Sequence, residues 1–464
     1  MNKILSSLFL FFILAGTVPI VWAHSETRLP GEAEKDKIEV KLLEEVKLTD
    51  EGLYFEGTKG VNYQFGKQIT PHGDCIEYAD GYVFVTWYKG GMDRRNLMLS
   101  RMKLGTGKWA TIQFPDRHFG YQGDSIKGDS HNTAAIGVCP IDKTIHLIYD
   151  IHSYFAKSFP DNYFNYRMSR KDATTVPDSE WNISLFSEKK SHLNPDISFE
   201  RTTYPEFDNM DDGKLIAKLR RGGSGKGNHT CFIYDGKSWS SDIVEFNRGK
   251  ERPDLDLYSI YGGFKYLHGK FHAGFSIRYY NNKKRTEGFE LNSGLYYART
   301  ADPALKRGWE AVDGKKVELP IEDPDIIRFA EPCELGLGKR ISSGPHWTVT
   351  ENDAKHFLIT VNGQTVHYYS KPGEAKFARQ FHDCNGNLFP VGDKVLMVGL
   401  DKGRPFMQYT REGTNDWKEI YREKEGRIYR HCHVEKFDDK VILYLMGMGT
   451  GCSQPIYLLV YSLR

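Results

Sequence analysis

A short alternating segment, a polar loop and a closing tryptophan recur along this chain, and this repeat limits the folds available to it. LMLSRMKLGTGKW and TCFIYDGKSW are clear copies, and the tryptophans that close such copies are Trp109, Trp181, Trp239, Trp309 and Trp417. A weaker copy, VHYYSKPGEAKF, lies between the last two. A β-rich unit that returns about every 60 residues is typical of a propeller blade built from four strands.

Apolar residues alternate with polar ones between glycine-bounded turns, which supports strands within each unit. The segments 81–88 (GYVFVTWY) and 439–447 (DKVILYLMG) are examples, and we find no convincing amphipathic helix after the leader. Six units and a C-terminal strand at 456–463 predict seven blades, and an early strand within 37–45 would close the ring. The expected fold is therefore an all-β, seven-bladed β-propeller. A β-sandwich with irregular insertions is the alternative.

The first 23 residues have the composition of a secretory leader. Lys3 supplies a positive start, an apolar run follows, and Val21 and Ala23 occupy the small-residue positions of a cleavage site. A membrane anchor is the alternative, but Gly16 and Pro19 interrupt the apolar run. We expect residues 1–23 to be a signal peptide and residues 24–464 to form one propeller domain. The protein is then secreted or periplasmic, without a membrane anchor.

The charge of the chain is balanced. Lysine and arginine total 63 and aspartate and glutamate total 61, for a formal net charge of +2. Such a balance gives no support to binding of nucleic acid or of an anionic membrane surface. We therefore expect no nucleic-acid partner.

Four polar residues occupy the ends of expected strands, where a propeller displays its site. His131 in GDSHN comes just before an apolar run, and His152 in YDIHS comes just after the strand-like IHLIYD. Tyr204 precedes a proline, which favours an extended backbone. Arg220 ends the strand-like GKLIAKLR before a glycine-rich loop, and Arg221 is the competing choice for the guanidinium.

These residue types suit work on an acidic sugar. Arginine can bind a carboxylate through two parallel hydrogen bonds, and histidine can exchange a proton near neutral pH. Tyrosine can donate a hydrogen bond or a proton to a sugar oxygen. Each residue taken alone also has a structural explanation, as a surface histidine or a half-buried core tyrosine. The glycine-rich loop 222–227 lacks the pattern of a phosphate-binding loop, so nucleotide binding is not expected.

The four segments and their spacings resemble the BNR-4-type propeller proteins. That group contains the ulvan lyases of polysaccharide lyase families 24 and 25, and glycoside hydrolase family 145, which removes rhamnose from glucuronic acid. The chain has no sialidase-type S-x-D-x-G-x-T-W box, which argues against a sialidase. The resemblance covers nearly all of the chain after the leader. It implies a seven-bladed propeller whose partner is an acidic, rhamnose-containing oligosaccharide or polysaccharide.

His72, in QITPHGDCIEY, directs the expectation toward glycoside hydrolase family 145. In the lyase relatives an apolar residue precedes the glycine, whereas this chain has a histidine there. The resemblance implies that His72 is the catalytic acid/base of an exo-acting α-L-rhamnosidase, on the opposite face of the ring from His131. Such an enzyme would release terminal rhamnose from glucuronic acid, as in arabinogalactan side chains.

Two other functions stay open. In a polysaccharide lyase, Arg220 would neutralise the uronate, His131 or His152 would remove its C5 proton, and Tyr204 would protonate the leaving O4 oxygen. A glycan-binding propeller without catalysis would instead use aromatic side chains of the blades, such as Trp87, Trp347 and Tyr279.

No cofactor is expected to take part in catalysis. The resemblance implies that a structural calcium or zinc ion can be present, but it assigns no ligands. Residue types suited to zinc occur in GNHTCF and RHCHVEK. They are His229, Cys231, His431, Cys432 and His433.

Overall fold

The computed structural model describes residues 37–68, 73–91, 94–249, 257–280, 291–336 and 340–464. Its regular structure is β-strand, apart from short 3-10 turns at Ala173–Thr175, Asp178–Glu180, Ile183–Leu185, Pro324–Ile327 and Pro332–Leu335. The expected signal peptide, residues 1–23, lies outside the described residues, and so does His72. In the described part of the chain, no helix is long and apolar enough to cross a membrane.

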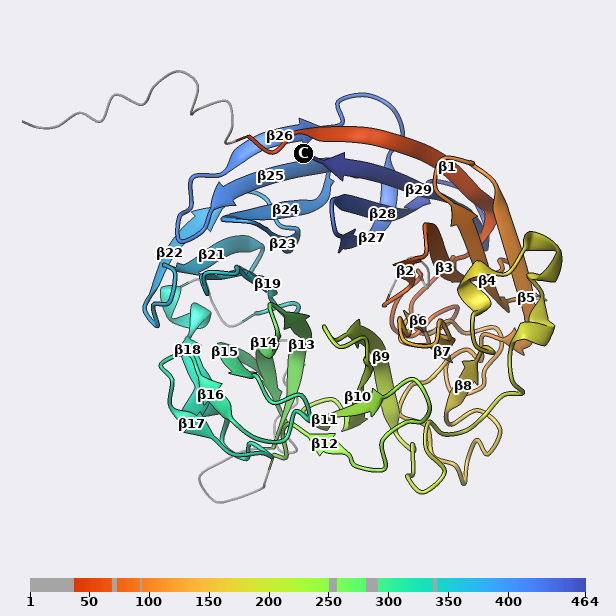
Figure 1. Ribbon diagram of the computed structural model, residues 1–464, viewed down its shortest axis with the longest axis horizontal. Coiled ribbons are helices and arrows are strands. Elements are labelled where there is room, and N and C mark those ends of the chain that lie inside the picture. The colour runs from red at the N-terminus through yellow and green to blue at the C-terminus, as the bar shows by residue number, and fades with distance from the viewer. Residues whose placement is uncertain (1–36, 69–72, 92–93, 250–256, 281–290, 337–339) are drawn as a thin grey trace, which may run out of the picture. The chain divides into compact units, whose positions relative to one another are not determined.

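Residues 39–464 form seven sheets, all with antiparallel neighbours, around a central axis (Figure 1). Each sheet is one blade, and the first three blades follow the chain in order. Blade 1 consists of β2 (Ile76–Ala79), β3 (Tyr82–Tyr88), β4 (Asn96–Lys103) and β5 (Trp109–Arg117). Blade 2 consists of β6 (Ala134–Val138), β7 (Ile145–Tyr149) and β8 (Asn165–Met168). Blade 3 consists of β9 (Thr202–Asn209), β10 (Leu215–Gly223), β11 (Lys226–Tyr234) and β12 (Val244–Glu245).

The remaining blades continue the same order. Blade 4 consists of β13 (Tyr258–Leu267), β14 (Lys270–Tyr279), β15 (Asn292–Thr300), β16 (Trp309–Ala311), β17 (Lys316–Val317) and β18 (Arg328–Ala330). Blade 5 consists of β19 (His346–Val349), β20 (Lys355–Val361), β21 (Gln364–Ser370) and β22 (Phe377–His382). Blade 6 consists of β23 (Asn387–Val391), β24 (Lys394–Asp401), β25 (Arg404–Arg411) and β26 (Lys418–Arg422). Blade 7 consists of β27 (Tyr429–Phe437), β28 (Lys440–Gly447), β29 (Ser453–Leu463) and β1 (Val40–Leu53).

The predicted seven-bladed propeller is confirmed, and the β-sandwich alternative is wrong. Five blades have four strands as expected, whereas blade 2 has three and blade 4 has six. The first strand of every blade lies nearest the axis: β2, β6, β9, β13, β19, β23 and β27 (Figure 1). The recurring aromatic residue marks the start of an outer strand, because Trp109 opens β5, Trp309 opens β16 and Phe377 opens β22.

The ring is closed by strands from distant parts of the sequence. β1 pairs along β29, from Val40 opposite Leu463 to Leu53 opposite Ser453. The predicted closing strand within 37–45 is therefore present, and it extends further than expected. Closure covers the edge of β29, which would otherwise present unpaired backbone groups.

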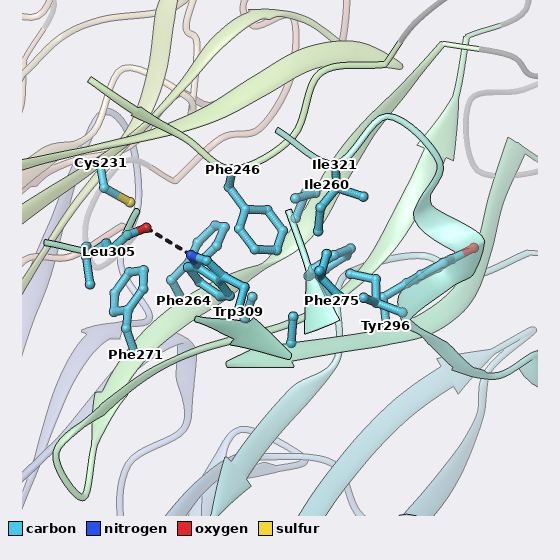
Figure 2. Packing of buried hydrophobic residues seen from close by; sticks show 14 of the residues in the cluster. Cys231, Phe246, Ile260, Phe264, Phe271, Phe275, Tyr296, Leu305, Trp309 and Ile321 are labelled. Carbon is cyan, nitrogen blue, oxygen red and sulfur yellow. Dashed lines mark hydrogen bonds between the residues drawn. The ribbon is translucent and has the colours of Figure 1, made fainter. Parts of the chain in front are cut away.

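Aromatic side chains pack blade 3 against blade 4 (Figure 2). Phe246, which follows β12, lies 4.9 Å from the ring of Trp309 and 5.0 Å from the ring of Phe264, centroid to centroid. The indole of Trp309 is 1% exposed and donates a hydrogen bond to the carbonyl of Leu305. Burial of such large rings is a main source of stability, and here it holds blade 3, which carries two of the candidate residues, in place.

Gly274 offers a test of the packing between blades 4 and 5. A Cβ atom at this position would lie 2.5 Å from two ring atoms of the buried Trp347. We expect Gly274→Ala to lower the free energy of unfolding by about 1–3 kcal/mol through overpacking, measured by thermal or denaturant unfolding. Gly263 is the cross-strand partner of Gly274, and a Cβ there would meet nothing closer than 3.8 Å. Equal stability losses in Gly274→Ala and Gly263→Ala would contradict this explanation.

Candidate active site

Strand register explains why the four candidate residues meet at one mouth of the ring. In blade 2, Ala134 at the start of β6 pairs with Tyr149 at the end of β7, so the segments that carry His131 and His152 leave the same end of the blade. In blade 3, Arg220 near the end of β10 pairs with Thr203 at the start of β9. The inner strands of successive blades run in the same direction, so these two ends adjoin. Antiparallel pairing thus brings four segments of the sequence together.

The two histidines stack on each other and share one carboxylate. Their ring centroids are 4.2 Å apart with an interplanar angle of 14°. The Nδ1 atom of His131 lies 2.9 Å from Oδ1 of Asp129, and that of His152 lies 2.5 Å from Oδ2. The Asp129 side chain is fully buried, whereas His131 and His152 keep 20% and 16% of their side-chain surface exposed. The edges of both imidazoles are therefore available at the mouth, beside Phe65, whose ring contacts both.

Electrostatics sets the protonation of this group. Burial would raise the pKa of the Asp129 carboxyl, but hydrogen bonds from His131 and His152 outweigh burial and hold that pKa well below its usual value. Asp129 is therefore ionised and can only accept, so both Nδ1 atoms donate to it. Burial lowers the pKa of His131, an effect that the bond to Asp129 opposes and that the neighbouring His152 reinforces. Near neutral pH, His131 thus carries its lone pair on Nε2.

Tyr204 sits in a β-bulge. The register between β9 and β10 shifts between Lys218 and Arg220, and Tyr204 has a φ of 55° in the left-handed region. Such a conformation is uncommon for a non-glycine residue and typically re-aims a side chain near a functional site. Its ring centroid lies 5.5 Å from that of His131. Burial raises the pKa of Tyr204, although Arg220 opposes the rise, so the phenol stays protonated near neutral pH.

Arg220 lies over the Tyr204 ring, with its Cζ atom 4.5 Å from the centroid. The residue is only 3% exposed, and among the described residues no carboxylate pairs with its guanidinium. Arg220 pairs with Thr203 on β9 and with His229 on β11, so the three residues lie side by side across the blade. One buried polar atom of each has no hydrogen-bond partner in the described chain: Arg220 Nε, Thr203 Oγ1 and His229 Nδ1. Gly227 makes room for the arginine, because a Cβ there would lie 2.9 Å from Cδ of Arg220.

The competing arginine points elsewhere. Arg221 donates a hydrogen bond to the carbonyl of Ser198. Its pKa is lowered by burial, but no contact joins it to Tyr204 or to either histidine in the described part of the chain. Of the two arginines, Arg220 is therefore the one that lies over the Tyr204 ring.

Sequence reasoning missed three residues of this centre. Asp129 was hidden inside the GDSHN motif, and an acidic residue two positions before a histidine was the available signal. Tyr261 and Arg278 extend the cluster on blade 4, with the Arg278 Cζ atom 4.3 Å from the Tyr261 ring centroid. Tyr261 also hydrogen-bonds the hydroxyl of Ser224 at 2.9 Å. No local pattern marks these two residues, because only the packing of blade 4 beside blade 3 brings them close.

Among the described residues, the other candidates are not part of this centre. His72 lies outside the described residues, and its prediction stays untested; the adjacent Gly73 lies against Thr133, near His131. Of the aromatic residues suggested for glycan binding, Trp87 and Trp347 are 4% and 1% exposed and serve as core, contrary to that suggestion. Only Tyr279 is partly exposed.

The histidines and cysteines suggested for zinc do not form one cluster. Burial lowers the pKa of His229 to about 3 and raises that of Cys231 to about 12, so both are neutral buried groups. Burial likewise raises the pKa of Cys432 to about 12, and Cys432 alternates to the other side of β27 from His431 and His433. Of these five residues, only His433 belongs to a group of three ligand-type side chains in the described chain, with Asp74 and Glu435.

Fold and site together define a seven-bladed propeller with a histidine, tyrosine and arginine centre suited to an anionic ligand. The family model described as "BNR repeat-containing family member" matches residues 82–381. The chain belongs to this family.

Its relatives include ulvan lyases. The short-isoform ulvan lyase of Alteromonas sp. (strain LOR) is 33% identical and covers 91% of this chain and 90% of its own length. The long isoform of Pseudoalteromonas sp. (strain PLSV) is 32% identical over 92% of this chain but only 47% of its own length. The crystal structure of the polysaccharide lyase Uly1 superposes with a TM-score of 0.83 at 31% identity, covering 91% of this chain and 99% of that chain.

A second structural neighbour shares the fold alone. An ulvan lyase of polysaccharide lyase family 25, solved bound to a unit of glucuronic acid and sulfated rhamnose, has a TM-score of 0.57 at 14% identity. It covers 91% of this chain and 98% of that chain.

These relatives correct the predicted activity. The expected exo-acting α-L-rhamnosidase, and with it the class of glycoside hydrolase, is wrong, because the relatives that match about nine-tenths of the chain are lyases. His72 is a single residue, whereas His131, His152, Tyr204 and Arg220 converge in space. The resemblance to ulvan lyases and to the BNR-4 group was correct, but the assignment to glycoside hydrolase family 145 was not.

Proposed function

We propose that this protein is a polysaccharide lyase that cleaves an acidic, rhamnose-containing polymer of the ulvan class by β-elimination at the uronic acid. Two lines of evidence support the proposal: the ulvan lyases among its relatives, and a site with an anion-binding group, a base and an acid in contact. The observation that carries the proposal is the buried Arg220 guanidinium, for which the described chain supplies no carboxylate.

Arg220 would bind the carboxylate of the uronic acid. A buried positive charge is costly unless it is paired, and a planar guanidinium matches a carboxylate through two hydrogen bonds. Neutralising the carboxylate makes the C5 proton more acidic, because the negative charge that develops on its removal spreads onto the carboxylate oxygens. Binding and activation of the substrate thus come from the same side chain.

His131 would remove the C5 proton, since of the two histidines it is the one whose ring contacts that of Tyr204. The hydrogen bond from His131 Nδ1 to Asp129 fixes the tautomer in which Nε2 of His131 is free to accept the proton. The stacked ring of His152 supports the His131 ring on one face. Tyr204 would donate its phenolic proton to O4 as the C4–O4 bond breaks. The C5–H electrons become the new C4–C5 double bond, so chain cleavage consumes no water.

Product analysis tests the reaction. Incubation of the protein with an ulvan-type polymer is expected to release oligosaccharides that end in an unsaturated uronate, detected by ultraviolet absorbance and by a mass one water lighter than a hydrolysis product. Saturated products without an absorbance increase would contradict elimination. Tight binding without any cleavage would favour the glycan-binding alternative.

The pH profile tests the base. Because the pKa of His131 lies below its ordinary value, the imidazole is already neutral at pH values near that ordinary value of 6.5. We therefore expect kcat/KM to fall only as the pH drops through the lowered pKa, with the acid limb below about pH 6.5. Asp129→Asn removes an interaction that raises the pKa of His131, so the acid limb should move to still lower pH while kcat falls. An acid limb that moves upward in this variant would argue against His131 as the base.

A further inference from the structure

We propose that the chain has a second anion-binding subsite beside the catalytic centre, in which Arg201 and Lys226 bind a sulfate ester on the sugar next to the uronic acid. This subsite rests on the proposed lyase function, because it would hold a sugar of the same polymer. Arg201 directly precedes β9 and Lys226 opens β11, so both residues lie at the end of blade 3 that carries Tyr204 and Arg220. A polymer bound across this mouth would therefore meet two cationic groups in succession.

The two cationic side chains approach the same point at the turn between β10 and β11. A Cβ atom at Gly223 would lie 3.6 Å from Nη2 of Arg201 and 4.0 Å from Cε of Lys226. Each cation also lies over an aromatic ring. Cζ of Arg201 is 5.0 Å from the ring centroid of Phe155. Nζ of Lys226 is 4.3 Å from the ring centroid of Tyr280, whose hydroxyl it contacts at 3.3 Å. A sulfate group near Gly223 would thus lie close to both cations.

Neither cation is neutralised by a carboxylate of the described chain. Arg201 makes no ion pair there, and its Nε atom is buried without a hydrogen-bond partner. The adjacent Glu200 instead accepts a hydrogen bond from the backbone N–H of Ala156 at 3.0 Å. Together with Arg220, Arg201 and the exposed Lys226 place three cations without a carboxylate at one end of blade 3, although the whole chain has a net charge of only +2. Such like charges repel one another, and an anion of the substrate would relieve the repulsion.

Strand register sets the distance from this subsite to the catalytic arginine. Arg220 pairs with Thr203, and two residues farther along β10 the backbone N–H of Gly222 donates to the carbonyl of Arg201 at 2.8 Å. Arg201 therefore lies two positions beyond Arg220 on the same strand pair, about 7 Å along the strands. That separation is comparable to the length of one sugar residue, so a uronate bound by Arg220 would place its neighbour at Arg201.

The backbone joins this subsite to the segment that carries His152. The N–H of Ser153 donates to the carbonyl of Thr202 at 2.8 Å, and the Ser153 hydroxyl donates to the carbonyl of Gly222 at 3.3 Å. Arg201 itself has a φ of 59°, in the left-handed region that is uncommon for a residue other than glycine. The subsite and the catalytic centre therefore share one framework of hydrogen bonds between blades 2 and 3.

The chemistry of the polymer identifies the anion. Arg220 would already bind the carboxylate of the uronic acid, so the second subsite would take a charge on the neighbouring sugar. In a polymer of uronic acid and rhamnose that neighbour is rhamnose, which has no carboxylate, and an anionic group on it must be an ester such as sulfate. A sulfate ester presents several acceptor oxygens to a guanidinium and an ammonium. The ring of Phe155, which is 49% exposed, would contact the apolar surface of the same sugar.

Binding measurements on the full chain test the subsite without depending on catalysis. Affinity electrophoresis compares gels that contain a sulfated, ulvan-type polymer with gels that contain the same polymer after chemical desulfation. We expect the wild type to bind the sulfated polymer about tenfold to a hundredfold more tightly, as for a charge-assisted contact. Equal affinity of the wild type for the two polymers would overturn the proposal.

Variants locate the sulfate. Arg201→Ala and Lys226→Ala should each lose most of the preference for the sulfated polymer, and each provides an answer if the other does not fold. Arg201→Lys should keep part of the preference. Lys237→Ala removes an exposed lysine from the turn after the other end of β11 and should keep all of it. Full preference in both alanine variants at the subsite, or the same loss in Lys237→Ala, would overturn the assignment.

Rates on the two polymers separate the subsite from the proposed reaction. In Arg201→Ala, the ratio of kcat/KM on the sulfated polymer to kcat/KM on the desulfated polymer should fall at least about tenfold. An unchanged ratio, with equal losses on both polymers, would mean that Arg201 does not recognise sulfate and would overturn the assignment. If neither polymer yields an unsaturated product while binding still depends on sulfate and on Arg201, the lyase proposal fails and the subsite stands.

Discussion

Replacement of Arg220 by alanine is expected to lower kcat/KM on an ulvan-type polymer by about a hundredfold to a thousandfold, the effect typical of losing one charge-stabilising group. The guanidinium is buried over Tyr204 and would both bind the uronate and stabilise the charge that develops at C5. The measurement is the rate of formation of unsaturated uronate at several polymer concentrations. Both kcat and kcat/KM should fall, because the interaction strengthens in the transition state.

Two matched variants make this result interpretable. Arg220→Lys keeps the positive charge but cannot form two parallel hydrogen bonds to a carboxylate. The rate of this variant should therefore lie between the rates of Arg220→Ala and of the wild type. Arg221→Ala removes the neighbouring guanidinium, which binds the Ser198 carbonyl, and should leave the rate within a few-fold of wild type. If Arg221→Ala is the damaging change and Arg220→Ala is not, the anion-binding assignment is wrong.

Tyr204→Phe is expected to lower kcat by about a hundredfold to ten-thousandfold, the usual contribution of a positioned general acid or base. Phenylalanine keeps the ring under Arg220 and beside His131 but removes the proton that O4 would receive. The rate is measured with saturating polymer, and thermal unfolding verifies that the variant is folded.

A fully buried tyrosine between blades 7 and 1 supplies the control. The Tyr444 hydroxyl on β28 of blade 7 donates a hydrogen bond to the carbonyl of Thr86 on β3 of blade 1, at 3.3 Å. Tyr444→Phe should lower the free energy of unfolding by about 1 kcal/mol and leave kcat essentially unchanged. A Tyr204→Phe enzyme with nearly full activity would transfer the role of acid to another group, such as His152 or Tyr261.

The predicted rhamnosidase activity was wrong because it depended on one isolated histidine. His72 differs from the apolar residue expected at this position in the lyase relatives, but a single histidine in a β-rich chain has many structural explanations. Strand register brings the four residues on blades 2 and 3 together. They lie at or beside two strand starts and two strand ends, which adjoin once the blades have formed. A set of residues constrained in this way is stronger evidence for a site than one unusual residue.

The sequence by itself determined the number of blades and the closing N-terminal strand, and it singled out four residues of the candidate site. The blades and the closing strand depend on local information, because strand alternation, turns and the recurring aromatic residue all occur within one repeat of about 60 residues. Only the tertiary structure revealed the Asp129 carboxylate shared by two histidines, the bulge that turns Tyr204 and the lack of a carboxylate beside Arg220 among the described residues.

The same distinction applies to contacts between the first and last blades. Asp74 and Glu435 lie far apart in the sequence, yet a carboxylate oxygen of one lies within 4.8 Å of a carboxylate oxygen of the other. Their contact depends on how blade 7 packs against blade 1, and that packing follows from closure of the whole ring by β1 and β29. Local periodicity specifies each blade, but contacts between blades arise only when all the blades have formed.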